Sequence, residues 1–232
     1  MQNILSQVIE RILSAQIEIE PFPHFVLDNV FLDQTYRDIL DHLPNDAEFI
    51  SPDPFRFGLN LNAQQLVRLK PENRAFWQRT CDWLLSEEFT NAVASKFYPF
   101  LKLRFFDNPD TVLKSAASLG RSKSGFLLGP HTDMPHRVLT LVFYLPENDQ
   151  NWEAGTSLYV PRDGSFTCSG GPHYGFENFQ KVATARFLPN AVVGFMKSET
   201  SFHGVEPWNE PGFIRNSLQY EIHDSDRSRY YG

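Results

Sequence analysis

The chain has 232 residues, of which 41% are hydrophobic and 21% charged, and this balance excludes a disordered or fibrous protein. Its formal net charge of −7 argues against binding to a nucleic-acid backbone, which needs clustered lysine and arginine side chains, so we expect no nucleic-acid partner. Two cysteines, Cys81 and Cys168, are too few for a disulfide framework or a cysteine-based zinc site.

The first part of the chain, residues 1–98, has the patterns of helices with one extended entry segment. Residues 1–20 have no basic flank before their apolar residues, so we do not expect a signal peptide. The apolar residues recur at helical spacing, which predicts a packing helix. Two prolines within residues 21–27 favour an extended segment, because proline disfavours helix in the residue before it. Further helices are predicted with Asp33 as N-cap, from Pro71 and near Ser86, and residues 51–62 are predicted to be a loop.

After residue 98 the pattern changes to short extended runs separated by turn residues. Runs at this spacing predict a sandwich or barrel, and therefore a mostly β fold with N-terminal helices. We expect one domain over residues 1–232, with helical support in 1–98, a β core in 99–223 and a tail in 224–232. The predicted strands are 99–106, 112–119, 125–129, 138–145, 156–161, 183–188, 191–197, 200–205 and 213–222.

Two segments bear on location and mobility. The longest nearly unbroken apolar run, residues 138–145, is far too short to span a bilayer, so we expect a cytoplasmic protein without membrane contact. The long connection over residues 162–181 contains several glycines and has no clear period. A connection of this kind in a compact domain is typical of a functional lid or a disordered segment, and we predict high mobility over 165–178.

A candidate metal site begins with the triplet that contains His131 and Asp133. Residues two apart in an extended chain point to the same side, so this imidazole and carboxylate can converge on one metal. With a second histidine they form the facial triad of non-haem iron(II), and His203 is the obvious second histidine. The triplet alone is weak, and by itself His131 is better interpreted as a surface histidine.

The last predicted strand strengthens this interpretation. Strict alternation over residues 213–222 places Arg215, Ser217 and Gln219 on one polar face. An arginine and a serine two apart can jointly hold a carboxylate, although an exposed edge strand would show the same pattern. Tyr144 lies in a strand that has the composition of one buried on both faces, and a carboxylate or the backbone would partner its hydroxyl.

Taken in order, the triplet His131-x-Asp133, the distal His203 and the pair Arg215-x-Ser217 resemble the iron(II)/2-oxoglutarate-dependent dioxygenases, most closely their prolyl 4-hydroxylase-like branch. The resemblance covers residues 112–223 and implies a double-stranded β-helix, or jelly roll, braced by helices. It implies iron(II) on the triad. It also implies 2-oxoglutarate held by Arg215, Tyr144 and Ser217, and O2 at the last open metal position.

The resemblance implies hydroxylation of an unactivated C–H bond, with succinate and CO2 as coproducts. The substrate would be an amino acid, a peptidyl residue or another small metabolite. Arg121, His136 and His173 are candidate substrate contacts. A solvated side chain is the better explanation for Arg121 and His136, and a mobile surface segment would also explain His173. Two alternatives stay open: a cupin-like metalloprotein of the same barrel class without 2-oxoglutarate, and a non-catalytic binding barrel.

Overall fold

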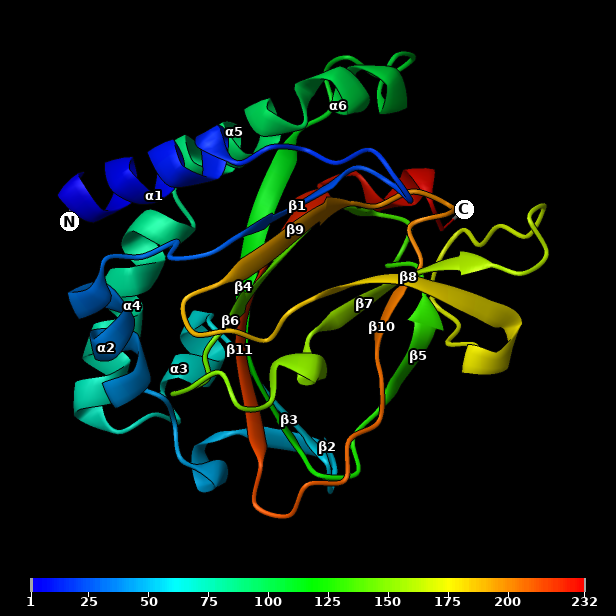
Figure 1. Ribbon diagram of the computed structural model, residues 1–232. Coiled ribbons are helices and arrows are strands. Elements are labelled where there is room, and N and C mark those ends of the chain that lie inside the picture. Colours follow the sequence, from blue (N-terminus) through cyan, green and yellow to red (C-terminus); the bar gives the residue numbers. More distant parts are fainter. Residues whose placement is uncertain (1, 232) are drawn as a thin grey trace.

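Two antiparallel sheets face each other in the computed structural model, which describes residues 2–231 (Figure 1). The larger sheet has seven strands in the order β1-β9-β6-β11-β4-β3-β2, and the smaller has four in the order β5-β10-β7-β8. The predicted mostly β fold with N-terminal helices is confirmed, as two sheets rather than one closed barrel. The strands are β1 (His24–Leu27), β2 (Ile50–Asp53), β3 (Arg56–Asn60), β4 (Leu113–Lys123), β5 (Leu128–His131), β6 (Arg137–Tyr144), β7 (Thr156–Pro161), β8 (Phe179–Ala185), β9 (Val192–Met196), β10 (His203–Val205) and β11 (Ile214–Asp224).

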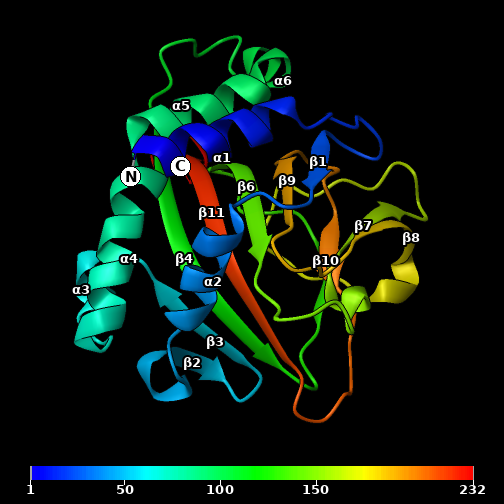
Figure 2. The ribbon, with the colours of Figure 1, turned by 60° about the vertical axis from the view of Figure 1, so that its left-hand side comes forward.

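The helices cover the outer face of the seven-stranded sheet (Figure 2). Pro71 opens one of them and the Ser86 hydroxyl caps the next by accepting the Phe89 backbone N–H, as the sequence predicts. No helix within residues 2–231 is long and apolar enough to cross a membrane. The helices are α1 (Gln2–Ser14), α2 (Asp33–Asp41), α3 (Ala63–Leu66), α4 (Pro71–Leu84), α5 (Glu87–Lys96) and α6 (Tyr98–Arg104).

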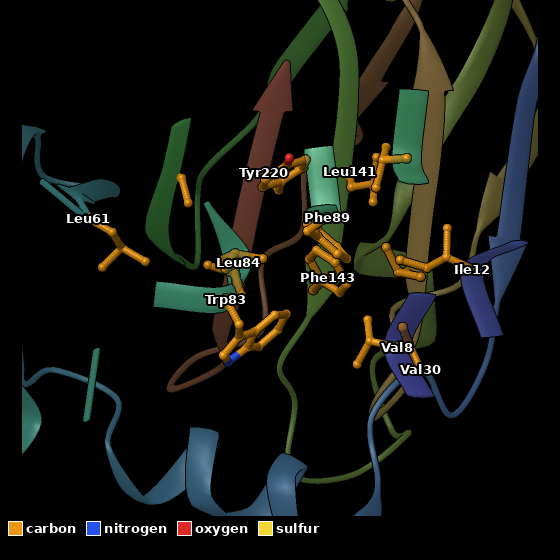
Figure 3. Close-up of a cluster of buried hydrophobic side chains, with 14 of the residues drawn as sticks. Val8, Ile12, Val30, Leu61, Trp83, Leu84, Phe89, Leu141, Phe143 and Tyr220 are labelled. Atoms are coloured by element: carbon orange, nitrogen blue, oxygen red, sulfur yellow. The ribbon is translucent and has the colours of Figure 1, made fainter. Parts of the chain in front are cut away.

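The main hydrophobic core lies between these helices and the sheet (Figure 3). Trp83, Leu84 and Phe89 from the helices contribute to the same buried cluster as Phe143 of β6 and Tyr220 of β11. Each such side chain contributes about 1.5–3 kcal/mol when fully buried. Because alternate residues of a strand face opposite sides, the other face of β6 and β11 is left to line the space between the two sheets.

Three predicted elements are wrong. Residues 98–104 form α6 instead of a strand: a proline in its first turn starts the helix, and Leu101 and Phe105, four apart, both pack on the core. The predicted loop at 51–62 contains the hairpin β2–β3, because β3 pairs with the edge of β4 from Arg56 opposite Ser122 onward. Asp33 starts α2 but does not cap it, since Leu32 occupies the N-cap position without a side-chain hydrogen bond.

The long connection at 162–181 is shorter than predicted, because β8 already begins at Phe179. Its aromatic side chains pack in a separate cluster: Phe166 and Tyr174 lie against Phe179 and Phe202, with ring centroids 4.8–6.3 Å apart. This packing ties the segment to the small sheet, and its predicted mobility stays a prediction. Of the predicted end segments, Met1 and Gly232 lie outside the described residues.

Candidate metal centre

Three candidate ligands meet where the two sheets enclose a cavity. His131 ends β5 and His203 begins β10, and these neighbouring antiparallel strands pair the two histidines directly opposite each other. Asp133 follows two residues after His131. All three side chains are buried, and their ligand atoms lie within 4.8 Å of one another. The structure therefore brings together the triad that the sequence predicts.

Each histidine is oriented by a backbone carbonyl two residues before it. The Nδ1 of His131 lies 3.0 Å from the Gly129 oxygen, and that of His203 lies 3.0 Å from the Ser201 oxygen. Since a carbonyl only accepts, each Nδ1 must donate, which leaves the Nε2 lone pair for a metal. Burial, with the nearby His203, lowers the pKa of His131 to about 3, and burial also lowers the pKa of His203. Both rings are therefore neutral at pH 7 and ready to ligate.

The carboxylate of Asp133 is held on both oxygens. Arg137 donates from Nη1 to Oδ1 at 2.7 Å, and the Thr140 hydroxyl donates to Oδ2 at 2.7 Å. Burial alone would raise the pKa of Asp133, but the nearby charges, that of the Arg137 guanidinium above all, outweigh burial and lower it to about 2. The result is an ionised carboxylate beside two neutral imidazoles, which is the donor set of a divalent-metal site.

The cavity extends from this triad to Arg215 and Ser217 on β11, and its volume is about 160 Å³. This is below the range of pockets that hold drug-sized ligands, so the cavity suits a small molecule. The Arg215 side chain is buried; its Nε donates to the Ala154 oxygen at 2.6 Å, and its guanidinium lies over the rings of Tyr144 and Phe187. No described carboxylate forms an ion pair with Arg215, and burial lowers its pKa.

Tyr144 has the backbone contacts that the sequence analysis left open beside a carboxylate partner. Its hydroxyl donates to the Ala185 oxygen at 3.2 Å and accepts the Thr156 backbone N–H at 3.0 Å. Both contacts are to the backbone, so the geometry does not support a hydroxyl that holds a ligand carboxylate. Instead the ring of Tyr144 lies 5.7 Å from the guanidinium carbon of Arg215 and forms part of its surroundings.

Two of the predicted substrate residues lie outside the cavity lining. Arg121 alternates to the opposite face of β4, where it bonds Asn216 and Asp46. His136 hydrogen-bonds the Tyr231 hydroxyl at 2.8 Å and lies beside the His223 ring. Alternation along β4 excludes Arg121 from the cavity, and these contacts hold His136 at the outer end of β6, so a substrate role for either is not supported.

His173, the third predicted substrate residue, lies next to the triad. Its ring centroid is 4.5 Å from that of His131, compared with 4.4 Å between His131 and His203. His173 belongs to the segment 168–174, called the strap below. The strap is attached to the free edge of β5, where the Tyr174 backbone N–H donates to the Pro130 oxygen at 2.9 Å. His173 is exposed and borders the site at its rim.

Arg56 and Ser122 line the cavity but were missed by sequence reasoning. The pairing of β3 with β4 and of β4 with β11 puts Arg56, Ser122 and Arg215 in one row across three strands. Residues opposite each other in neighbouring strands share a face, so all three face the cavity. The signal was hidden because residues 51–62 have loop composition.

No protein-family model and no curated protein matches the sequence. Solved structures do match it in fold. A prolyl-4-hydroxylase from Pseudomonas putida is 14% identical with a TM-score of 0.50, over 95% of this chain and 99% of that chain. An oxidoreductase of the 2OG-Fe(II) oxygenase family from Burkholderia pseudomallei is 12% identical with a TM-score of 0.51, over 94% and 89%.

HygX from Streptomyces hygroscopicus, solved with nickel and 2-oxoglutarate bound, is 14% identical with a TM-score of 0.50, over 88% of this chain and 83% of that chain. The chain therefore has the jelly-roll-like fold of these oxygenases. At such identities the likeness concerns the fold, and the chemistry has to be argued from the side chains of the site.

Proposed function

We propose that this chain is an iron(II)- and 2-oxoglutarate-dependent oxygenase that hydroxylates an unactivated C–H bond. The observation that carries the proposal is the buried Arg215 in the same small cavity as the triad, without a carboxylate partner among the described residues. An uncompensated buried cation is unfavourable, so a cavity that keeps one is suited to an anionic ligand. This arginine therefore favours an enzyme with an anionic cosubstrate over a metalloprotein that binds no anion.

The residues present fit the implied metal. His131, Asp133 and His203 would hold iron(II) through two Nε2 atoms and one carboxylate oxygen, a set that leaves three positions on one side of the metal open. When bound, iron(II) with 2-oxoglutarate supplies the activation of O2, and succinate and CO2 are released. The neutral histidines need lose no proton to bind, which favours metal uptake at pH 7.

The chain's own residues bind and orient the cosubstrate. Arg215 would take the far carboxylate of 2-oxoglutarate through its guanidinium nitrogens, while its Nε stays on the Ala154 oxygen. Ser217, two residues along the same face of β11, adds a hydroxyl donor. Because both side chains lie on one strand, the backbone of β11 fixes the separation between these two donors.

For the substrate we propose an amino acid, a peptidyl residue or a small metabolite. The small cavity supports this choice, since it leaves only the rim near His173 and Arg56 for a second molecule once 2-oxoglutarate is bound. HygX has also been solved with hygromycin B bound, and the prolyl-4-hydroxylase acts by its name on prolyl groups. The proposed reaction is therefore hydroxylation of a substrate from one of these classes.

The proposal is tested by titration of 2-oxoglutarate, without oxygen, into manganese-loaded wild type and the Arg215→Ala variant. Truncation of one partner in a buried charge pair typically costs about 2–5 kcal/mol, or roughly 30-fold to several thousand-fold in affinity. Arg215→Ala should weaken 2-oxoglutarate by that order and leave the manganese dissociation constant nearly unchanged.

Pyruvate is the matched control ligand, because it lacks the far carboxylate and its weak binding should be insensitive to the variant. Equal constants for 2-oxoglutarate in both proteins, or no binding to wild type, would remove the cosubstrate and favour the cupin-like metalloprotein. Succinate formation against a panel of amino acids, peptides and metabolites then identifies the substrate.

A further inference from the structure

Arg137 joins two carboxylates in the wall of the cavity. Its Nη1 donates to Asp133 Oδ1 at 2.7 Å, and its Nη2 donates to Glu221 Oε1 at 2.7 Å. The three side chains are largely buried, with 22%, 5% and 15% of the Arg137, Asp133 and Glu221 side chains exposed. The guanidinium fork therefore spans from the candidate metal ligand to a second acidic group that is not one of the three clustered ligands.

The oxygen that Arg137 contacts also faces the second histidine of the triad. Asp133 Oδ1 lies 3.9 Å from Nε2 of His203, so a small approach of the two side chains would let both atoms bind one metal ion. The other oxygen, Oδ2, is fixed by Thr140. Both rotations of the carboxylate are therefore blocked, and the arginine determines which lone pair of Oδ1 points into the site.

Glu221 fixes the arginine through the sheet register. Glu221 on β11 pairs directly with Thr140 on β6, so it lies on the same face of the sheet as the cavity-lining Thr140, next to the row of Arg137. His223 supports it from the outside, with Nε2 3.1 Å from Glu221 Oε2. The chain of contacts runs from the surface of β11 through Glu221 and Arg137 to Asp133.

The backbone at Arg137 is anchored from the helical layer. Arg104, the last residue of α6, donates from Nη2 to the carbonyl oxygens of Pro135 and Arg137 at 2.9 Å each, and from Nη1 to the Lys197 oxygen at 2.8 Å. The turn between Asp133 and β6 is thus tied at its carbonyls, and the guanidinium of Arg137 starts from a fixed Cα position.

We infer that Arg137, held by Glu221, is a positioning residue that presents one oxygen of Asp133 to the metal. This inference rests on the metal half of the proposed function and is independent of 2-oxoglutarate. Outer partners of metal ligands typically affect metal affinity 10- to 100-fold, which is roughly the size expected here.

The sign of the effect follows from the charges of the three groups. A guanidinium beside a divalent cation would by itself weaken binding, but the charge of Glu221 offsets that of Arg137, so their pair adds no net charge. Loss of Arg137 leaves the charge of Glu221, which by itself would attract a cation, but it also frees the Asp133 carboxylate to rotate, and we expect the lost orientation to outweigh the charge and weaken binding. Loss of Glu221 leaves the arginine charge uncompensated and unanchored, which also weakens binding.

The experiment is titration of metal-free protein with nickel(II) in the absence of 2-oxoglutarate, for Arg137→Met, Arg137→Lys and Glu221→Gln. We expect a dissociation constant roughly 10- to 100-fold weaker for Arg137→Met. Lysine keeps the charge but cannot fork between two carboxylates, so Arg137→Lys should recover only part of the loss. Glu221→Gln should weaken binding by a smaller factor. The double variant Arg137→Met/Glu221→Gln should raise the dissociation constant by less than the product of the two single factors, because both substitutions act through one contact.

Arg74→Met is the matched control. Arg74 is also a partly buried arginine that uses Nη2 for hydrogen bonds, here to Val67 and Leu69 oxygens in the region of α4, and its Nε is likewise buried without a partner. It should bind nickel(II) like wild type. A spectroscopic readout separates positioning from general damage: the visible ligand-field bands of the cobalt(II)-loaded protein should shift in Arg137→Met, but not in Arg74→Met.

Three outcomes overturn the inference: wild-type nickel affinity in folded Arg137→Met, equal losses in Arg137→Met and Arg74→Met, or no metal binding by wild type. If Arg137→Met does not fold, the nickel(II) titrations of Arg137→Lys and Glu221→Gln test the inference instead, and wild-type affinity in both would overturn it. The proposed function fails by a different result. If wild type binds nickel(II), and Arg137→Met weakens that binding, but wild type does not bind 2-oxoglutarate, the proposed function is wrong and the positioning role of Arg137 stands.

Discussion

The two ends of the cavity are built by different means. At the metal end, each histidine is oriented by a carbonyl two residues earlier in the chain. At the arginine end, Arg215 is held by the Ala154 oxygen, 61 residues away in sequence, and by rings from two other segments. Local contacts thus prepare the metal ligands, whereas the register of the sheet prepares the anion site.

This difference implies that the two ends fail separately. Damage to a ligand should remove the metal while the arginine end persists, and damage to the arginine end should leave metal binding intact. The four predictions below test the separation, from the largest expected effect to the smallest.

The largest effect is expected for loss of a histidine ligand. His131→Ala and His203→Ala each remove one of three protein ligands, and we expect nickel(II) affinity to fall by more than about 100-fold, beyond the loss typical of outer partners. The fold should persist, because both rings line the cavity rather than the main hydrophobic core. Isothermal titration and far-UV circular dichroism measure both properties; full metal affinity in either variant would disprove the triad.

A second variant breaks the metal end through the strap. Gly170 has φ of +136°, and a Cβ there would lie 2.2 Å from the Asp133 carbonyl oxygen. Gly170→Ala should lower the free energy of unfolding by about 1–3 kcal/mol from backbone strain, with a further loss from the clash, and should weaken metal binding. Gly164→Ala is the control, since nothing lies within 4 Å of a Cβ at that position. Chemical denaturation that finds both variants alike would contradict the role of the strap.

A third prediction concerns the pH dependence of the metal-free protein. Burial lowers the pKa of His131 to about 3 and lowers that of His203, whereas a histidine in the unfolded chain titrates near 6.5. Between about pH 6 and pH 4 the unfolded chain therefore binds protons that the folded protein does not, and stability falls as the pH falls.

His131 alone contributes an expected slope of about 1.4 kcal/mol per pH unit, and the lowered pKa of His203 acts in the same direction. The pKa of Asp133 is lowered below its usual value near 3.8, so the stability that it contributes is lost only below this window. His131→Gln should reduce the slope by about one histidine's share. Urea unfolding at several pH values checks this, and an unchanged slope in the variant would show that His131 titrates normally.

The smallest effect is expected for Tyr144→Phe at the arginine end. The hydroxyl bonds the Ala185 oxygen and the Thr156 N–H, so its loss should lower stability by about 1 kcal/mol. Affinity for 2-oxoglutarate should change by less than about threefold, or roughly 0.7 kcal/mol, because no hydroxyl contact to the ligand is lost. A loss as large as that of Arg215→Ala in the same titration would restore the hydroxyl as a direct ligand of the carboxylate.

Much of the site could be predicted from the sequence because it lies on strands with regular alternation. The two-residue period of β11 puts Arg215 and Ser217 on one face. The same spacing predicted that His131 and Asp133 point to one side, and the structure brings them together although Asp133 lies just beyond the end of β5. Arg121 is an exception. Alternation along β4 determines which face Arg121 occupies, but which of the two faces lines the cavity became clear only from the pairing of β4 with β11 and β3.

The sequence by itself determined the amphipathic helices, the mostly β second part and the chemical character of the metal ligands, because these depend on contacts within a few residues. Only the tertiary structure decided that residues 50–60 form a hairpin, that residues 98–104 are helical, that Tyr144 bonds the backbone, and that Arg137 bridges Asp133 to Glu221. Each of these depends on partners 12 or more residues away or on the packing of a whole face. Local propensity cannot specify such contacts, because their free energy exists only once both segments are in place.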